Sequence, residues 1–227
     1  MIRAAVAGAG RMGQAIAGLI EARDHMQLVG VWRRGDDLDR LVRDADVIID
    51  FSLPEGTMQV LDSVANASKP LVCGVSGLND AQLARLDEVA ASVPVVYDRN
   101  MSLGVAVLDR AVRDAAATLG MEFEVAISEV HHVHKVDAPS GTALKLGETI
   151  AAARGESGTG SIRFSSERRG EVPGDHEVVM RSATESLTFV HSVTTRDVFA
   201  TGAVRAAGWV IGQGPGRYRM RDVLLPD

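Results

Sequence analysis

Short apolar runs alternate with amphipathic stretches through the first hundred residues. Uninterrupted apolar runs of this length are typical of buried strands, and apolar residues three or four apart indicate helices. A helix is expected after the first run, where Ile16, Leu19 and Ile20 recur at helical spacing, and another at 80–91, with Asp80 near its start. The expected strands are residues 2–7, 27–32, 45–51, 70–75 and 93–97, with a further helix-like stretch between the third and the fourth. Strands that alternate with helices predict a parallel, doubly wound sheet.

The alternation of strands and helices stops in the second half of the chain. Residues 102–119 form one long expected helix that leaves the first domain. The elements expected after it are a strand at 123–130, a helix at 140–153 and strand-like runs at 161–165, 176–182 and 186–194. This order predicts a second lobe in which a sheet carries its helices on one side. A last helix at 198–211 is expected to return and cover the first domain.

Composition and charge narrow the class of protein. The chain has 227 residues, of which 46% are hydrophobic and 24% charged, so each of two modest domains can have its own core. The single cysteine, Cys73, excludes an intrachain disulfide and fits a cytoplasmic protein. We find no signal peptide and no apolar run near the roughly 20 residues of a membrane span. The net charge of −6 argues against a nucleic-acid partner, and an anionic ligand needs a locally cationic site.

The turn after the first expected strand reads GAGRMG, with glycines at positions 8, 10 and 13. A strand, a glycine-rich turn and a helix in this order are typical of a dinucleotide-binding site. Gly8 permits the tight turn, Gly10 lets the main chain approach a pyrophosphate, and Gly13 lets the helix pack against the strand. Free N–H groups at the helix start then face the anion. The alternative is a plain strand-to-helix turn in another α/β fold.

Arginines follow the second expected strand. In NAD-binding folds an acidic residue there binds the ribose 2′-hydroxyl, but this chain has Arg33 and Arg34. A guanidinium can bind a 2′-phosphate bidentately, so we predict NADPH as the preferred cofactor, with NADH possible. The acidic residues Asp36, Asp37 and Asp39 come too late for a ribose ligand. The alternative is that both arginines are solvated surface residues.

Small residues follow the later strands of the expected parallel sheet. The ligand crevice of such a sheet lies at the carboxyl ends of its strands. Phe51-Ser52, residues 74–77 and residues 99–101 would lie there. Glycine and serine at these places can flank a flat nicotinamide ring and bind its amide. Any one of these segments can also be a short polar loop without a ligand.

Residues 129–142, EVHHVHKVDAPSGT, gather half of the six histidines beside Lys135. One interpretation is a metal site, since His132 and His134 would share one face of a strand, although Lys135 would repel the ion. A second is a polar strand end with solvated imidazoles. A third is an acid–base site for an anion, because histidine titrates near neutrality and Ser140 is a good helix N-cap with free N–H groups behind it.

Geometry restricts the acid–base interpretation. Residues four apart on a straight strand are roughly 13 Å apart. His131 and Lys135 can therefore reach one small substrate only if the chain bends after His132. The Val-Asp-Ala-Pro segment that follows Lys135 is consistent with a loop.

The same segment, extended to EVHHVHKVDAPSGTAL, closely resembles the signature of the dihydrodipicolinate reductase family. The resemblance covers nearly the whole chain and includes GAGRMG, DFSLPEGT, CGVSGL, NMSLGV, RRGEVPGDHEV, FATGAVRAAGWV and YRMRDVL. It implies a Rossmann-type dinucleotide-binding domain at 1–101, completed by 199–227. It also implies a smaller α+β domain with a mixed sheet at 102–198, which binds the substrate and builds a homotetramer. The implied reaction is the NAD(P)H-dependent reduction of 4-hydroxy-tetrahydrodipicolinate, a small dicarboxylate, in lysine and diaminopimelate biosynthesis.

The resemblance also implies roles for individual residues. His131 becomes the proton donor and acceptor and Lys135 a proton donor, while His132, Ser140, Gly141 and Thr142 bind the substrate. The expected cofactor residues, which include the two arginines and Phe51, are Gly8, Ala9, Gly10, Arg11, Met12, Gly13, Arg33, Arg34, Phe51, Gly74, Val75, Ser76, Asp98, Arg99, Asn100 and Met101. No metal is expected. Two alternatives stay open, namely another NAD(P)-dependent oxidoreductase acting on an amino-acid-derived imine or carbonyl, and a non-catalytic NADP(H) sensor.

This sequence departs from the family's usual pattern at the cofactor segments. The glycine turn is one residue shorter than the common G-x-x-G-x-x-G, and Arg33 stands where an acidic ribose ligand is usual. Asp98-Arg99 stands where small residues usually precede the Asn-Met-Ser segment.

Overall fold

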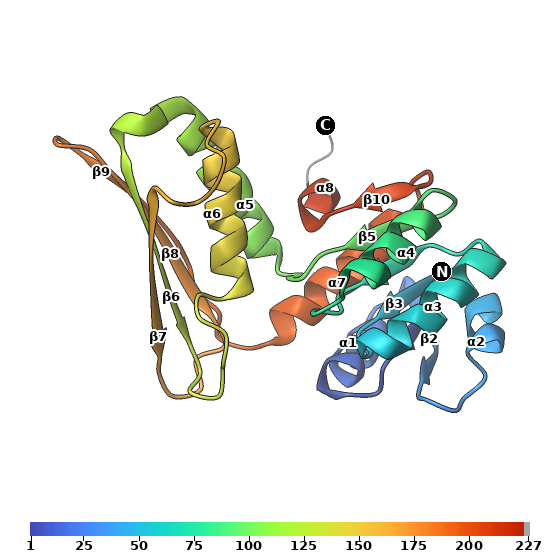
Figure 1. Ribbon diagram of the computed structural model, residues 1–227. Coiled ribbons are helices and arrows are strands. Elements are labelled where there is room, and N and C mark those ends of the chain that lie inside the picture. The colour runs from blue at the N-terminus through green and yellow to red at the C-terminus, as the bar shows by residue number, and fades with distance from the viewer. Residues whose placement is uncertain (225–227) are drawn as a thin grey trace. The chain divides into compact units, whose positions relative to one another are not determined.

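The computed structural model describes residues 1–224 and divides into two compact units. The first contains Met1–Leu103 and the chain from Asp197 onward, and the second contains Gly104–Arg196. The boundaries lie within two residues of those expected for the two domains. Figure 1 shows the elements of both units.

The first unit is built on a parallel sheet of six strands. Its elements are β1 (Ile2–Ala7), α1 (Arg11–Glu21), β2 (Met26–Trp32), α2 (Leu38–Asp44), β3 (Val47–Asp50), α3 (Pro54–Ala67), β4 (Leu71–Cys73), α4 (Asp80–Ala90), β5 (Pro94–Tyr97), α7 (Asp197–Val210), β10 (Gly216–Tyr218) and α8 (Met220–Leu224). The strand order is β10-β5-β4-β3-β1-β2. Buried Val, Ile, Leu and Ala side chains fill the short strands, because helices cover both faces of the sheet.

Helices α2, α3 and α4 pack on one face of this sheet, where their apolar sides form a core with Trp32, Leu71 and Tyr97. Helix α7 contacts α1 and strands β3, β4 and β5, so the last long helix covers the first unit as expected (Figure 1). Every strand pair is parallel. The predicted Rossmann-type, doubly wound sheet is confirmed.

Three short elements of this unit were not expected from the sequence. Helix α2 has seven residues, strand β10 has three and helix α8 has five. Segments this short carry too few apolar residues for a clear period. Asp37 was a missed signal for α2, because its carboxylate accepts a hydrogen bond from the Arg40 N–H at 2.9 Å and caps the helix.

The second unit is a four-stranded mixed sheet with helices on one face (Figure 1). Its elements are α5 (Leu103–Leu119), which begins at the boundary, η1 (Gly120–Glu122), β6 (Glu124–His131), α6 (Gly141–Ala153), β7 (Ile162–Arg168), β8 (Asp175–Arg181) and β9 (Ser186–His191). The strand order is β7-β6-β8-β9, with β6 parallel to β7 and antiparallel to β8. Side chains of α5 and α6 share one core with the inner face of the sheet. The predicted α+β domain with a mixed sheet is confirmed.

Within residues 1–224, none of the helices is both long enough and apolar enough to cross a membrane.

Candidate active site

The glycine turn between β1 and α1 depends on the absence of side chains. Gly8 has φ +103°, and a Cβ added there would lie 2.6 Å from the carbonyl oxygen of Phe51. A Cβ on Gly13 would lie 1.7 Å from the carbonyl oxygen of Gly8, so only glycine lets α1 start this close to the turn. A Cβ on Gly10 would meet nothing within 4 Å. Open space at Gly10 beside the N–H groups of α1 fits the close approach of a pyrophosphate.

Main-chain hydrogen bonds align this turn with the ends of the neighbouring strands. The Gly8 N–H donates to the carbonyl oxygen of Trp32 at 3.1 Å, and the Phe51 N–H donates to that of Ala7 at 2.9 Å. The Gly74 N–H donates to the carbonyl oxygen of Asp50, also at 2.9 Å. The carboxyl ends of β1 to β4 therefore form one edge, where a doubly wound sheet binds its ligand.

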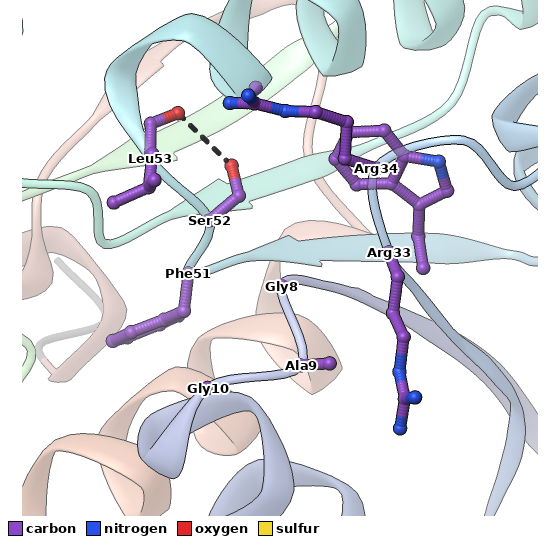
Figure 2. Close-up of a pocket in the computed structure, with 10 residues that line it drawn as sticks. Gly8, Ala9, Gly10, Arg33, Arg34, Phe51, Ser52 and Leu53 are labelled. Carbon is purple, nitrogen blue, oxygen red and sulfur yellow. Dashed lines mark hydrogen bonds between the residues drawn. The ribbon is translucent and has the colours of Figure 1, made fainter.

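A cavity of about 430 Å³ opens at this edge (Figure 2). Arg33 extends on the side of the glycine turn, whereas Arg34 extends toward Ser52 and Leu53 (Figure 2). The residues that line the cavity are Gly8, Ala9, Gly10, Trp32, Arg33, Arg34, Phe51, Ser52, Leu53 and Gly56. Ser52 was expected at this crevice together with Phe51, whereas Trp32, Leu53 and Gly56 were not expected there. Two guanidinium groups and a glycine turn in one cavity fit a phosphorylated dinucleotide.

The acidic residues that follow Arg33 have local structural roles. The Asp36 carboxylate accepts a hydrogen bond from the Arg33 N–H at 2.9 Å, and Asp37 caps α2. Asp39 accepts a hydrogen bond from the Ser63 hydroxyl at 2.5 Å. Each of the three carboxylates is therefore engaged within the unit.

The other expected cofactor residues lie next to the cavity lining or are turned into the unit. Arg11, Met12 and Gly13 begin α1. Gly74 follows β4 and touches the Phe51 ring so closely that a Cβ there would lie 2.3 Å from it. Residues 75–76 continue this segment, with Val75 buried and Ser76 exposed.

The segment after β5 is held by its own carboxylate. Asp98 is buried and accepts hydrogen bonds from the N–H groups of Asn100 and Met220, each at 3.4 Å. Met101 is buried, while Arg99 is exposed. Asp98 therefore joins this segment to the start of α8.

In the second unit, strand β6 carries a buried face that changes from apolar to polar. Val125 and Ile127 belong to the apolar core, and Glu129 and His131 continue the same face as buried polar residues. The register places Arg168 of β7 beside His131, and His176 of β8 beside Glu129. Cross-strand neighbours share a face, so four chemically active side chains meet at one end of the sheet.

Glu129 is the centre of this cluster. The Nδ1 atom of His131 forms a hydrogen bond with its carboxylate, and the two terminal nitrogens of Arg168 donate to its two oxygens at 3.0 Å each. Burial raises the pKa of Glu129, but the hydrogen bonds from Arg168 and His131 outweigh burial and hold the pKa below its ordinary value. Near neutral pH the carboxylate is therefore ionised.

The chain bends at the end of β6. A strand that placed His132 and His134 on one face would have to continue to residue 134. β6 ends at His131, and the Lys135 N–H donates to the carbonyl oxygen of His132 at 3.1 Å in a turn. The expectation that His132 and His134 share a strand face is therefore wrong, because both residues lie beyond the strand. The bend that His131 and Lys135 require is present. The Lys135 ammonium pairs with the Asp137 carboxylate at 2.7 Å.

Helix α6 begins directly after this loop. Ser140 is its N-cap, as expected, and its hydroxyl accepts a hydrogen bond from the Ala143 N–H at 3.2 Å. A Cβ added to Gly141 would meet nothing within 4 Å, so there is open space beside Gly141 at the helix start. Thr142 is the next residue of the helix. The Nδ1 atom of His132 is enclosed and has no hydrogen-bond partner among residues 1–224. These features fit a carboxylate-bearing ligand.

His176 packs against this site from β8. Its Nε2 atom lies 3.2 Å from the Ser140 hydroxyl, and its ring meets the His131 ring edge-on at 5.2 Å between centroids. Burial lowers the pKa of His176 to about 4, and the charges of His131 and His191 add to this effect. His176 is therefore neutral at physiological pH.

Sequence reasoning missed Glu129, Arg168 and His176 as site residues. All three lie in segments that carry the family resemblance, EVHHVHKVDAPSGTAL and RRGEVPGDHEV. No local spacing shows that they converge, because Arg168 is 39 residues from Glu129 in the chain.

A Rossmann-type unit with an open glycine turn, together with a unit that gathers histidine, lysine and an open helix start, defines a nicotinamide-dependent oxidoreductase. Known proteins narrow this class. The family models described as "Dihydrodipicolinate reductase, N-terminus" and "Dihydrodipicolinate reductase, C-terminus" match residues 2–101 and 104–224. The chain belongs to the dihydrodipicolinate reductase family.

Curated relatives agree over most of their length. The 4-hydroxy-tetrahydrodipicolinate reductase of Alkalilimnicola ehrlichii is 42% identical over 221 residues, which cover 88% of this chain and 83% of that protein. The enzyme of the same name from Zymomonas mobilis subsp. mobilis is 38% identical over 241 residues, covering 96% and 95%. The dipicolinate-bound dihydrodipicolinate reductase from Paenisporosarcina sp. TG-14 has a similar fold, with a TM-score of 0.83 at 23% identity, over 96% of this chain and 97% of that one.

The activity follows from the family. The chain reduces 4-hydroxy-tetrahydrodipicolinate to tetrahydrodipicolinate with NAD(P)H in lysine and diaminopimelate biosynthesis. The predicted function is confirmed, and the alternatives of another oxidoreductase or a non-catalytic sensor are set aside.

Proposed function

We propose that NADPH is the preferred cofactor and that the β1–α1 turn and the end of β2 hold it. Gly8, Gly10 and the first N–H groups of α1 receive the pyrophosphate, and Arg33 binds the 2′-phosphate, while Arg34 lines the cavity toward Ser52 and Leu53. The proposal is supported by the open space at Gly10 and by the cavity that both arginines line. The other expected cofactor residues, at 74–76 and 98–101, contribute the nicotinamide side. The bound cofactor supplies a hydride.

We propose that the substrate's carboxylates bind at the start of α6. The observation that carries this proposal is the open space at Gly141 in the helix start. In the loop before α6, the Nδ1 atom of His132 is enclosed and has no hydrogen-bond partner among residues 1–224. The first turn of α6 contains no acidic residue of its own, and its Gly141 N–H donates a hydrogen bond to the Asp137 carboxylate of the preceding loop. Ser140 shapes the helix start, and a substrate carboxylate takes the place of the Asp137 carboxylate at the Gly141 N–H, with Thr142 next in the helix.

His131 and Lys135 complete the chemistry in this proposal. Reduction of a conjugated imine leaves negative charge on the substrate, which must be protonated. The Lys135 ammonium stabilises this charge as it develops and donates a proton, and His131 exchanges protons through its Nε2 atom. The ion pair of Lys135 with Asp137 opens or is shared when the substrate dianion binds, because both anions then compete for one ammonium.

A selectivity assay tests the cofactor proposal. The substrate is generated freshly from pyruvate and aspartate semialdehyde, and the oxidation of NADPH and of NADH is followed separately. Arg33→Glu is expected to raise the KM for NADPH by about 10- to 100-fold, because a charged hydrogen bond of about 1.5–3 kcal/mol is lost. The KM for NADH should change little. The exposed Arg43→Glu on α2 is the charge-matched control. An unchanged NADPH-to-NADH ratio in Arg33→Glu would remove Arg33 from the phosphate site.

A planar substrate mimic tests the substrate site. Pyridine-2,6-dicarboxylate should inhibit competitively with the substrate, and His132→Gln should weaken this inhibition by about 10-fold or more. The exposed His134→Gln is the control and should leave the inhibition constant unchanged. A crystal soak that places the mimic away from residues 131–142 would contradict the assignment.

We also propose that the enzyme is a cytoplasmic homotetramer. Exposed apolar side chains on strand β9, Leu187 and Val190, support an assembly surface on the second unit. The buried free thiol of Cys73 suits a reducing compartment. Light scattering on the purified protein tests the assembly, and a mass of one chain would contradict it.

A further inference from the structure

The Glu129 carboxylate joins three segments of the second unit. Its side chain is fully enclosed, with 0% of its surface exposed. It accepts hydrogen bonds from the His131 ring, from Arg168, and from the Ser140 N–H at 3.3 Å. The end of β6, the end of β7 and the start of α6 are therefore tied to one buried anion.

This anion determines how His131 can act. An ionised carboxylate only accepts hydrogen bonds, so Nδ1 of His131 carries a proton and Nε2 remains for exchange. Nε2 lies against Gly174, where an added Cβ would come within 2.8 Å of it. Gly174, which directly precedes β8, thus places no side chain of its own against this atom.

Arg168 binds more than Glu129. Its Nε donates to the Lys135 carbonyl oxygen at 3.2 Å, and one terminal nitrogen donates to the Asp137 carbonyl oxygen at 2.5 Å. The other terminal nitrogen donates to the carbonyl oxygen of Glu167 at 2.8 Å. With the two bonds to Glu129, all five donors of the guanidinium have acceptors within the chain.

The five satisfied donors distinguish between two possible roles for Arg168, which are binding the substrate and positioning other residues. A substrate-binding arginine would offer free N–H groups to a carboxylate, whereas Arg168 has none to offer. Its side chain is 21% exposed, and its bonds lead to the two segments that carry His131 and Lys135. A lysine there could satisfy at most three acceptors and could not form the bidentate pair with Glu129.

We propose that Arg168 is a positioning residue of the reductase, whose guanidinium fixes the His131 imidazole through Glu129 and fixes the Lys135 main chain directly. This inference rests on the proposed roles of His131 and Lys135. Arg168 holds the two proton-carrying side chains in one arrangement and does not touch the substrate.

Steady-state kinetics of Arg168→Lys test the proposal. We expect kcat to fall by about 10- to 100-fold, the effect of misplacing reacting groups by about 1 Å. The KM for NADPH should stay within about twofold of the wild-type value, because the cofactor segments belong to the other unit. Arg169→Lys is the matched control, since the neighbouring Arg169 is exposed and pairs with Glu167 at 3.4 Å. A near-normal kcat in Arg168→Lys, or a higher substrate KM at normal kcat, would overturn the proposal.

Two further measurements keep the proposal testable if Arg168→Lys folds poorly. Free guanidinium at millimolar concentration should restore part of the kcat of Arg168→Ala and leave Arg169→Ala unchanged. Ring ¹⁵N shifts of His131 should show the Nδ1–H form in the wild type and a tautomer mixture in Glu129→Gln. Absence of rescue together with an unchanged tautomer would contradict the positioning role.

The same assay separates failure of this inference from failure of the proposed function. His131→Gln and Lys135→Ala are measured beside Arg168→Lys. Full activity of both would refute the proton-transfer roles themselves. Inactive His131→Gln and Lys135→Ala beside a fully active Arg168→Lys would refute only the positioning role.

Discussion

Helices α1 and α6 begin in similar ways but are supported by different means. Both have open space at a glycine of the helix start, Gly10 in one and Gly141 in the other, and neither has an acidic residue in its first turn. The start of α1 is shaped by main-chain atoms and missing side chains. The start of α6 is held by the Ser140 cap and by the buried Glu129 carboxylate of β6, which in turn pairs with Arg168 of β7.

The difference shows that the two proposed anion sites are built in different ways, one from local residues and one from residues far apart in the chain. The glycine turn depends only on the residues between β1 and α1 and on the neighbouring strand ends. Its conformation is therefore determined by steric fit. The site at α6 needs Glu129 and Arg168 on adjacent strands, so charge pairing decides it. We therefore expect steric changes to disable the first site, and changes of charge or pH to disable the second.

The largest effect is expected from adding one methyl group to the glycine turn. In Gly13→Ala the new Cβ would lie 1.7 Å from the Gly8 carbonyl oxygen, so α1 must shift. We expect the free energy of unfolding to fall by at least about 3 kcal/mol. NADPH binding should weaken by about 100-fold or more. Urea unfolding and NADPH fluorescence measure the two effects.

Gly18→Ala is the matched control on the same helix. Nothing lies within 4 Å of the added Cβ there, so the variant should gain about 0.5–1 kcal/mol in stability. Equal behaviour of the two variants would show that close packing at Gly13 does not govern the turn.

Removing the ammonium group should have the next largest effect. Lys135→Ala should lower kcat by about 100-fold or more, the usual contribution of a proton donor. The neighbouring Val136 is 96% exposed, so Val136→Ala should keep the wild-type rate. A Lys135→Ala enzyme with near-normal turnover would remove Lys135 from the mechanism.

His176, in the second unit, should make the free energy of unfolding depend on pH. The pKa of His176 is about 4 in the folded chain and 6.5 ordinarily, so the folded state binds fewer protons between these values. His176 therefore contributes stability that is present above about pH 6.5 and is lost as the pH falls toward about 4. His176→Gln should reduce the loss of unfolding free energy between about pH 7 and pH 5 by about 2 kcal/mol.

Urea unfolding at a series of pH values measures this contribution. The exposed His134→Gln serves as control and should follow the wild-type curve. The prediction is wrong if the free energies of unfolding of His176→Gln and of the wild type change in parallel with pH.

The smallest effect, with the opposite sign, is expected in the first unit. Burial raises the pKa of Asp50, although hydrogen bonds from Ser52 oppose it. A raised pKa in the folded state means that the contribution of Asp50 is present below its ordinary pKa and is lost as the pH rises through the folded value. The stability of Asp50→Asn relative to wild type should therefore increase with pH above about 4 in urea unfolding. A relative stability that decreases with pH would contradict this sign.

Most of the fold could be predicted because its strands and longer helices follow clear periods. Segments 2–7 and 80–91, for example, differ from the observed β1 and α4 by at most one residue. α2 and β10 could not be predicted, because tertiary packing and pairing with β5 stabilise them more than local preference does. The cavity residues Trp32 and Leu53 were missed for a related reason, since only the folded edge brings them beside the glycine turn.

The sequence by itself determined the glycine turn, the N-cap at Ser140 and the family, because these depend on neighbouring residues or on recognisable motifs. Only the tertiary structure decided that Arg168 pairs with Glu129 and that His176 meets Ser140. The physical reason is that strand order and register bring these residues together. Hydrogen bonds between strands far apart in the chain leave no periodic signal in the sequence.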